Sequence, residues 1–484
     1  MPAPVFPFAL AAAAVLASPA APPPPRKAAP ANALLEAGRA YERERRFDEA
    51  AASYEAALAR TPSLVEARDR LGFVRGQQGR TADAIREFET AVRLRPDFFD
   101  AQYHLGATQW WVGNVDEASP ALQAAVRLAP DHAEARYYLA LTLEKKGDPA
   151  GAVRHLRKAV AVNPDLAPAW MRLGMALDAL GDPRDAVDAL RRAVALQPQG
   201  AEARNALGLA LMDAGAGEEA VSTFRAQLAA HPDDAIARHN LGSALLHQGD
   251  LDAAIAVYRE LVRAAPDDAE AAYNLAMALK QKDDFAGALA ELNRAVRLNP
   301  ALYDAQYALG VVLWQTGRVE EAMAAFRAGI GRKPDFADAH YMLATILRQQ
   351  GRLDDALAEF REAIRLRPDA AEGHLSLGQL LQQKGDRAAA ADAFAEAQRL
   401  QRLKGDAQAG AFAASTAGDK LRRGDVAGAI DGFREAVRLD PRNADAHLQL
   451  ARALERAGRG DEARSAFDEA RRLAPWLEIP EPRS

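Results

Sequence analysis

The sequence predicts an all-α protein, an α-solenoid of about 13 helix–turn–helix repeats. Prolines recur at intervals of 34 residues, and a period near 34 is typical of stacked helical hairpins. Between them, apolar or small residues recur three and four positions apart, as on one face of a helix. Neither helix of such a unit buries its apolar face alone, so each repeat needs neighbours. The recurring prolines are Pro62, Pro96, Pro130, Pro164, Pro198, Pro232, Pro266, Pro300, Pro334 and Pro368, with Pro441 and Pro475 further on.

A common frame gives individual positions of the repeat a physical role. Position 8 is Gly or Ala throughout, position 20 is always Ala, and position 24 is Phe, Tyr or Leu, so we expect two helices that approach closely around one bulky side chain. Position 15 is mostly Gly, which ends the first helix with a positive φ, and proline at position 32 ends the second. The thirteen repeats begin at Ala31, Val65, Phe99, Ala133, Ala167, Ala201, Ala235, Ala269, Tyr303, Ala337, Ala371, Gly410 and Ala444.

With these positions in phase, the chain from Ala31 to Leu477 resembles the tetratricopeptide repeat family. The resemblance implies a right-handed superhelix whose first helices line a concave groove, mainly through positions 2, 5, 6, 9, 12 and 13. It also implies a protein that binds polypeptide segments. Two features depart from the family pattern: position 4 is rarely aromatic, and Arg402 stands in place of one proline. One repeat shows the pattern in full, with Trp170, Leu173, Gly174, Leu177, Ala186, Leu190, Ala193 and Pro198.

The first 30 residues differ from the array. Residues 1–20 resemble a secretory signal peptide, because an apolar run from Val5 to Ala17 precedes the small residues Ser18-Pro19-Ala20. No basic residue precedes the run, and the alternative is an Ala/Pro-rich leader. The leader predicts a periplasmic or secreted protein, with a cytoplasmic one as the alternative. Residues 21–30 predict a stiff Pro/Ala-rich spacer.

Two places interrupt the array. Pro120 falls inside a second helix, where it predicts a bend on the outer face. Pro368 and Pro441 are 73 residues apart, two repeats plus five. We therefore predict an insertion at 405–409, a joint that divides an array at 31–404 (repeats 1–11) from a tail at 410–477 (repeats 12–13). A C-terminal tail, 478–484, follows. Trp476 and its apolar neighbours are expected to cover the last repeat or to form a contact surface.

Composition excludes several classes of function. The 61 basic and 67 acidic residues nearly balance, with a net charge of −6, which argues against a dedicated nucleic-acid-binding protein. The sequence contains no cysteine, so it predicts neither disulfides nor a cysteine-ligated metal. No stretch is long enough to be a typical transmembrane helix.

Catalytic signatures are absent from the sequence. No phosphate-binding glycine loop, dinucleotide fingerprint or nucleophile elbow occurs. His340, His374 and His447 share position 4, where the family packs a side chain between helices, so a structural role is favoured over metal binding. The sequence therefore predicts no enzyme, no cofactor and no metal site.

Candidate binding residues come from the concave positions that the resemblance implies. Aromatic side chains in a groove offer a large contact area at low entropic cost; for the tyrosines, packing between neighbouring helices is the alternative. Two asparagines at position 6 are suited to bind an extended peptide backbone, and they resemble a fragment of the asparagine ladder of O-linked N-acetylglucosamine transferases. The predicted set is Tyr103, Trp110, Tyr137, Asn240, Tyr273, Asn274, Tyr307, Trp314 and Tyr341.

The function predicted from these observations is a non-enzymatic interaction scaffold that holds a polypeptide segment in its groove. The alternative is a regulatory or substrate-recruiting subunit of a separate enzyme, for example a glycosyltransferase. The family's carboxylate clamp for chaperone tails needs Lys at positions 2 and 5 and Asn at 9, and it is absent. We exclude that class of partner.

Overall fold

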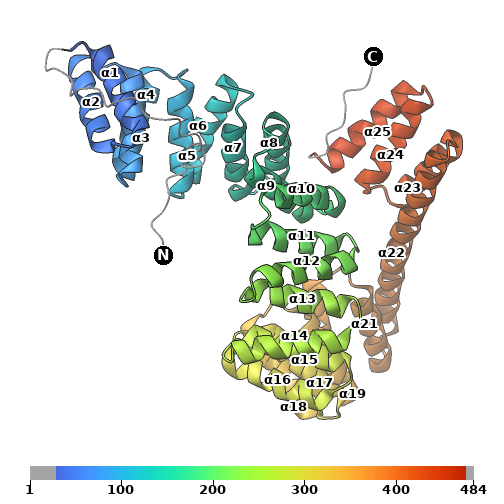
Figure 1. Cartoon of the computed structure of the whole chain (residues 1–484). Helices are drawn as coiled ribbons and strands as arrows, with labels where there is room; N and C mark the ends of the chain where they lie inside the picture. The colour runs from blue at the N-terminus through green and yellow to red at the C-terminus, as the bar shows by residue number, and fades with distance from the viewer. Residues whose placement is uncertain (1–28, 476–484) are drawn as a thin grey trace. The chain divides into compact units, whose positions relative to one another are not determined.

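A computed structural model describes residues 29–475 of the chain. Within that range the protein forms 25 α-helices and no β-strand, which confirms the predicted all-α fold of consecutive helical hairpins (Figure 1). The predicted leader at 1–20, most of the spacer, Trp476 and the C-terminal tail at 478–484 lie outside the described residues.

The chain divides into two compact units, the first ending at Ala210 and the second beginning at Leu211, within α11. The helices of the first unit pack as pairs in chain order. They are α1 (Ala31–Arg43), α2 (Phe47–Arg60), α3 (Val65–Gln77), α4 (Thr81–Leu94), α5 (Phe99–Trp111), α6 (Val115–Leu128), α7 (Ala133–Lys145), α8 (Pro149–Val162), α9 (Ala167–Ala179), α10 (Pro183–Leu196) and α11 (Ala201–Asp213), which reaches into the second unit.

The second unit continues the same pairing, and it ends with a longer helix and three short ones. Its helices are α12 (Gly217–Ala230), α13 (Ala235–His247), α14 (Leu251–Ala264), α15 (Ala269–Gln281), α16 (Phe285–Leu298), α17 (Tyr303–Gln315), α18 (Val319–Arg332), α19 (Ala337–Gln349), α20 (Leu353–Leu366), α21 (Ala371–Lys384), α22 (Arg387–Arg422), α23 (Val426–Leu439), α24 (Ala444–Arg456) and α25 (Gly460–Leu473).

Small residues let the two helices of each hairpin approach, as the repeat frame predicts. A Cβ added at Gly310 would lie 2.8 Å from the ring of Phe326, which is itself fully buried. The alanine at position 20 is 0–3% exposed in every repeat. The side chain at position 24 therefore fills the space that positions 8 and 20 leave open.

The turn inside each hairpin uses a left-handed residue at position 15. Eleven glycines there have φ between 70° and 87°, which confirms the predicted helix ends. The two exceptions carry side chains: Arg45 has φ 59° and Asp283 has φ 61°.

Position 4 has a role that its sequence pattern did not reveal. In nine repeats its side chain donates a hydrogen bond to the carbonyl oxygen of the proline six residues earlier, which joins the first helix to the preceding loop. Several residue types make this bond, so position 4 needs a donor of sufficient reach rather than an aromatic ring. The donors at 2.6–3.1 Å are Arg68, Gln102, Arg136, Trp170, His340, His374 and His447, joined by Arg204 and Arg238.

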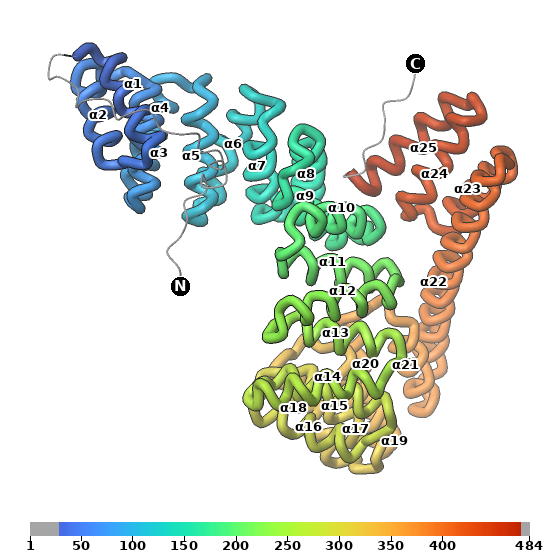
Figure 2. The backbone as a smooth tube through the Cα atoms, in the orientation of Figure 1, coloured from blue at the N-terminus to red at the C-terminus, as the bar shows by residue number. Residues whose placement is uncertain are grey.

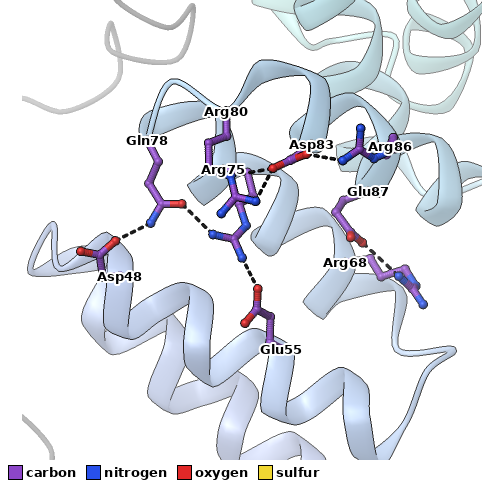
Figure 3. Close-up of polar contacts among 9 residues, drawn as sticks. All are labelled: Asp48, Glu55, Arg68, Arg75, Gln78, Arg80, Asp83, Arg86 and Glu87. Atoms are coloured by element: carbon purple, nitrogen blue, oxygen red, sulfur yellow. Dashed lines mark hydrogen bonds and ion pairs between the residues drawn. The ribbon is translucent and has the colours of Figure 1, made fainter.

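A second set of polar contacts joins successive repeats at the hairpin turns. Gln78 Nε2 donates to Asp48 Oδ1 at 2.7 Å, thirty residues earlier, and Arg75 forms an ion pair with Glu55 beside it (Figure 3). Lys146 and Asp116 repeat the first contact at 2.8 Å. These pairs are exposed, so each contributes at most about 1 kcal/mol.

The structure corrects the helix boundaries predicted around the insertion. Residues 405–409 do not interrupt the chain; they lie inside α22, a single helix that combines the second helix of repeat 11 with the first of repeat 12 (Figure 2). Arg402 replaces the terminating proline, and no residue of α22 has a positive φ. Gly405 and Gly410 weaken the helix by roughly 1 kcal/mol each without ending it. The division of the array at this point stays a prediction.

The other predicted irregularity lies within a continuous helix, and the bend expected there stays a prediction. Pro120 is inside α6 and is exposed, as expected for a residue that faces away from the neighbouring helices.

Candidate functional site

The candidate site is a groove of about 760 Å³ in the second unit, formed by α17, α19, α20, α21 and α22. Its volume lies in the range of about 300–1,000 Å³ that is typical of ligand-binding clefts. The residues that line it are Tyr307, Ala337, Asp338, Tyr341, Met342, Ala363, Ile364, Arg367, Asp369, Ala370, Glu372, Gly373, Leu400, Leu403 and Lys404.

Two tyrosines at position 5 of successive repeats form one part of the groove. Tyr307 packs against Phe336, with ring centroids 5.1 Å apart, and Tyr341 packs against Phe360 at 5.7 Å. The Tyr341 hydroxyl lies 3.1 Å from Ser376 Oγ, which orients the ring. Both rings are half-buried, so each is held in place and still contributes surface to the groove.

Aliphatic side chains form the floor. Met342 and Ile364 come from α19 and α20, and Leu400 and Leu403 come from α22. Gly373 keeps the floor open, because a Cβ there would lie 3.1 Å from Ile364 Cγ1. Leu403 is 54% exposed. A surface of this kind gains free energy when an apolar ligand covers it.

Charged groups stand around the floor. Arg367 forms an ion pair with Asp338, in which Nη1 lies 3.5 Å from Oδ2. Asp369, Glu372 and Lys404 make no ion pair within residues 29–475. Burial raises the pKa of the Tyr307 hydroxyl, and the Asp338 carboxylate adds to the effect. The groove therefore combines an apolar floor with charges of both signs that are free to pair with a ligand.

Of the nine predicted binding residues, the groove brings together Tyr307 and Tyr341. Tyr273 and Trp314 lie in the same unit but pack against its hydrophobic core outside the groove lining. Asn240 is 8% exposed. Asn274 Nδ2 donates to the Glu270 carbonyl oxygen of its own helix at 2.8 Å, so this donor is already used.

The three predicted residues of the first unit belong to one aromatic cluster. Tyr103 is 9% exposed and stacks on Phe99 with an interplanar angle of 6° and a centroid distance of 5.8 Å. Trp110 and Tyr137 both meet Tyr138 edge-on, at 5.6 and 5.4 Å. These contacts correspond to the packing alternative for the tyrosines. Contact with a ligand stays a prediction for Trp110 and Tyr137, which are half-buried.

Sequence reasoning missed the groove residues that come from second helices. Ile364 and Arg367 occupy positions 28 and 31, which the concave-face assignment leaves out. Leu403 and Lys404 were missed because a helix break was predicted directly after them. The absence of proline between 387 and 422 was the available signal for one continuous helix.

Among residues 29–475, no three His, Cys, Asp or Glu side chains are grouped so that they could hold a metal ion. No helix in this range is both long and apolar enough to cross a bilayer.

Comparisons with known proteins agree with the repeat frame. A family model described as Tetratricopeptide repeat matches residues 70–110, 108–169, 171–228, 218–269 and 273–337. Two further models with that description match 33–66 and 420–475, and one described as TPR repeat matches 344–385. No curated protein matches the chain.

Several solved structures are similar to parts of the chain. A structure of MamA is 25% identical and covers 34% of this chain and 96% of its own, with a TM-score of 0.33. MamA 41-end from Desulfovibrio magneticus RS-1 is 25% identical over 35% of this chain and 96% of that one, with a TM-score of 0.33. YrrB, described as a TPR protein with an unusual peptide-binding site, is 20% identical over 38% and 96%, with a TM-score of 0.36.

Proposed function

Because the chain belongs to the tetratricopeptide repeat family, we propose that it is a non-enzymatic scaffold that binds a polypeptide segment, and that the groove of the second unit is its binding site. The observation that carries the proposal is the groove floor, where Leu403 is 54% exposed between half-buried tyrosines and aliphatic side chains. An apolar surface made of several side chains and lined also by charged groups is typical of an interaction site.

The groove favours a segment with large apolar side chains. The apolar side chains of the segment would cover Ile364, Leu400 and Leu403. Removing this apolar surface from water favours binding. Asp369, Glu372 and Lys404, which line the groove, would pair with charges of the segment. Since Tyr341 already bonds Ser376, its ring supplies contact area rather than a free hydroxyl.

A peptide library tests the proposal. The full chain is panned against a phage-displayed library of random peptides, and the affinity of enriched peptides is measured by fluorescence anisotropy. Leu403→Asp should weaken their binding by tenfold or more, because burying a leucine contributes about 1.5–3 kcal/mol. Leu298→Asp is the matched control, since Leu298 is 38% exposed and lies outside the groove.

Three outcomes would count against the proposal. Equal losses of peptide affinity in the two variants would show that the substitutions disturb the fold and not the groove. If no peptide were enriched at all, the proposed binding site would be refuted. Recovery of an intact enzyme bound to the native protein, with no effect of Leu403→Asp, would support the recruiting-subunit alternative instead.

Export is a separate proposal, and the sequence of the leader supports it. Amino-terminal sequencing of the protein from its native cell checks it: a mature start after Ala20 is expected, and a chain that keeps Met1 would contradict it.

A further inference from the structure

A second groove, of about 570 Å³, lies in the first unit, between α1, α3 and the start of α5. It differs from the first in chemistry, because charged side chains replace the aliphatic floor. Five carboxylates and three guanidinium groups line it, together with Phe98. The charged side chains, but not Phe98, occupy positions of the first three repeats that the family resemblance places on the concave face.

Two of the five carboxylates are neutralised by ion pairs of their own. Glu66 Oε1 accepts from Arg95 Nη2 at 2.6 Å, and Glu36 Oε1 accepts from Arg39 Nη1 at 2.9 Å. Exposed Arg43 donates to the backbone carbonyl oxygen of Arg39.

The other three carboxylates surround a single guanidinium group. Arg70 Nη1 donates to Glu42 Oε1 at 3.2 Å, and its Nε lies 3.4 Å from Asp69 Oδ2. Burial opposes the charge of Arg70, but Asp69, Glu42 and Asp100 outweigh it and raise its pKa above the usual range. Three negative charges thus act on one positive charge, so the cluster carries an excess of carboxylates.

The cluster also lacks hydrogen-bond donors for some of its carboxylate oxygens. Asp69 is 1% exposed, and its Oδ1 accepts from His104 Nδ1 at 2.7 Å, whereas its Oδ2 accepts no hydrogen bond. A buried carboxylate oxygen without a donor costs about 1–3 kcal/mol. Half-buried Asp100 makes neither a hydrogen bond nor an ion pair within residues 29–475. Both observations favour a ligand that carries positive charge and hydrogen-bond donors.

We infer that this groove binds the cationic side chain of a lysine or arginine from a polypeptide partner. Asp100 is the contacting carboxylate, and Glu42 and buried Asp69 add negative charge to the same groove. The inference rests on the proposed function only in that the partner is a polypeptide; it does not need the groove of the second unit. Acidic segments are disfavoured, because they would add charge to the excess of carboxylates.

Fluorescence anisotropy with the full chain tests the inference. The probe is a fluorescein-labelled peptide of alternating glycine and lysine, with glutamate and serine versions of the same length. The lysine probe alone should bind, less tightly as salt rises. Asp100→Asn should weaken it about tenfold. The fold should stay intact, since Asp100 makes no hydrogen bond within the described residues.

A carboxylate at the equivalent position of another repeat provides the matched control. Asp304, also at position 2 and half-buried, makes no ion pair in the described part of the chain, and Asp304→Asn should leave lysine-probe binding unchanged. Equal losses in the two variants, or equal binding of all three probes, would overturn the inference. Leu403→Asp separates the two proposals: it should weaken the binding of apolar peptides by tenfold or more and leave lysine-probe binding unchanged.

Discussion

At the scale of single residues, the hydrogen bond from position 4 to the preceding proline carbonyl is a stabilising contact that can be isolated. Gln102 Nε2 donates to Pro96 O at 2.8 Å and is 7% exposed. Gln102→Met keeps the length of the side chain and removes the donor, so the free energy of unfolding should fall by about 1 kcal/mol. Urea unfolding followed by circular dichroism measures the change.

The chain contains a control for this substitution. Gln306 occupies position 4 of repeat 9 and makes no hydrogen bond with its side chain within residues 29–475. Gln306→Met should therefore be close to neutral. Equal effects of the two substitutions would show that packing, and not the proline carbonyl, determines the contribution of position 4.

Backbone strain at position 15 gives a prediction of the opposite sign. Arg45 adopts a left-handed φ of 59°, where a side chain costs about 1 kcal/mol. Arg45→Gly should raise the free energy of unfolding by up to that amount, despite the greater flexibility of glycine in the unfolded chain.

Gly79→Ala is the reverse case: φ is 76° and no atom lies within 4 Å of the added Cβ, so a loss of about 1 kcal/mol would come from the backbone alone. Thermal unfolding of both variants checks the pair, and a loss of stability in Arg45→Gly would contradict the argument.

At the scale of helices, the contact between positions 8 and 24 limits the size of the side chain that a hairpin accommodates at position 8. Gly310→Ala places a Cβ 2.8 Å from the Phe326 ring, which should separate α17 from α18 and cost about 1–3 kcal/mol. Gly331→Ala, near the end of α18, meets nothing within 4 Å and should stabilise by about 0.5 kcal/mol through helix propensity. Chemical denaturation of both variants tests the pair; a loss at Gly331 as large as at Gly310 would refute a steric cause.

A half-buried histidine makes the stability of α7 and α8 depend on pH. Burial lowers the pKa of His155 to about 4, and the nearby Arg136 guanidinium contributes. Arg136 Nη1 lies 3.5 Å from His155 Nδ1 and its Nε donates to Pro130 O at 2.6 Å, so the neutral ring is an acceptor that supports this contact. Above about pH 6.5 the neutral ring stabilises the fold fully.

Acidification should remove this contribution. As the pH falls from about 6.5 towards 4, the unfolded chain binds the proton first, and on the order of 2 kcal/mol should be lost after allowance for partial exposure. His155→Gln keeps an acceptor and cannot titrate, so its unfolding free energy should fall less between pH 7 and 4.5. Parallel pH profiles for the two proteins would disprove the assignment.

The sequence predicted most of the helical hairpin and only part of the binding site, for physical reasons that particular residues show. Positions 8, 15, 20 and 24 were predictable because packing and φ limit them to few residue types. Tyr103 shows the opposite case: a tyrosine on the concave side is equally compatible with ligand contact and with stacking on Phe99, and only the coordinates distinguish them. The donors at position 4 were missed because Arg, Gln, Trp and His make the same bond, so no single residue type is common to all the repeats that make it.

The part of the groove on α22 was also missed. The repeat frame records the apolar residue that is usual at a position, and it hides the single repeats in which a polar residue stands there. Position 28 is apolar in every repeat except the eleventh and the last, which carry Gln398 and Arg471. Position 7 is leucine except at Ala37 in the first repeat and Thr416 in the twelfth. Terminal repeats of a solenoid need polar outer faces, so repeats 11 and 12 have the composition of array ends.

At the scale of the whole chain, this composition explains why α22 does not turn back between those repeats. Asp419 at position 10, the only charged residue there in the thirteen repeats, would be buried if the first helix of repeat 12 packed against repeat 11. Burying it without a partner costs several kcal/mol, more than the helix loses by including Gly405 and Gly410. Repeats 11 and 12 are therefore coupled through a continuous backbone and not through an apolar interface.

A distance measurement distinguishes the continuous helix from a hairpin. The sequence has no cysteine, so Gln398→Cys and Ser415→Cys provide two exposed spin-labelling sites in an otherwise unlabelled chain. Seventeen residues of helix separate them by about 26 Å along its axis. Pulsed electron paramagnetic resonance should therefore give one long distance.

A chain that turned back at 405–409 would bring the labels to the interaxial distance of packed helices, about 8–10 Å. Arg68 and Glu87 show this case, since they are nineteen residues apart in a regular hairpin and form an ion pair of 3.0 Å. Labels at those two positions provide the short-distance control. A short distance for the α22 pair would mean that repeats 11 and 12 stack. Leu403 and Lys404 would then lie outside the groove of the second unit, and the proposal of peptide binding would lose part of the apolar floor on which it rests.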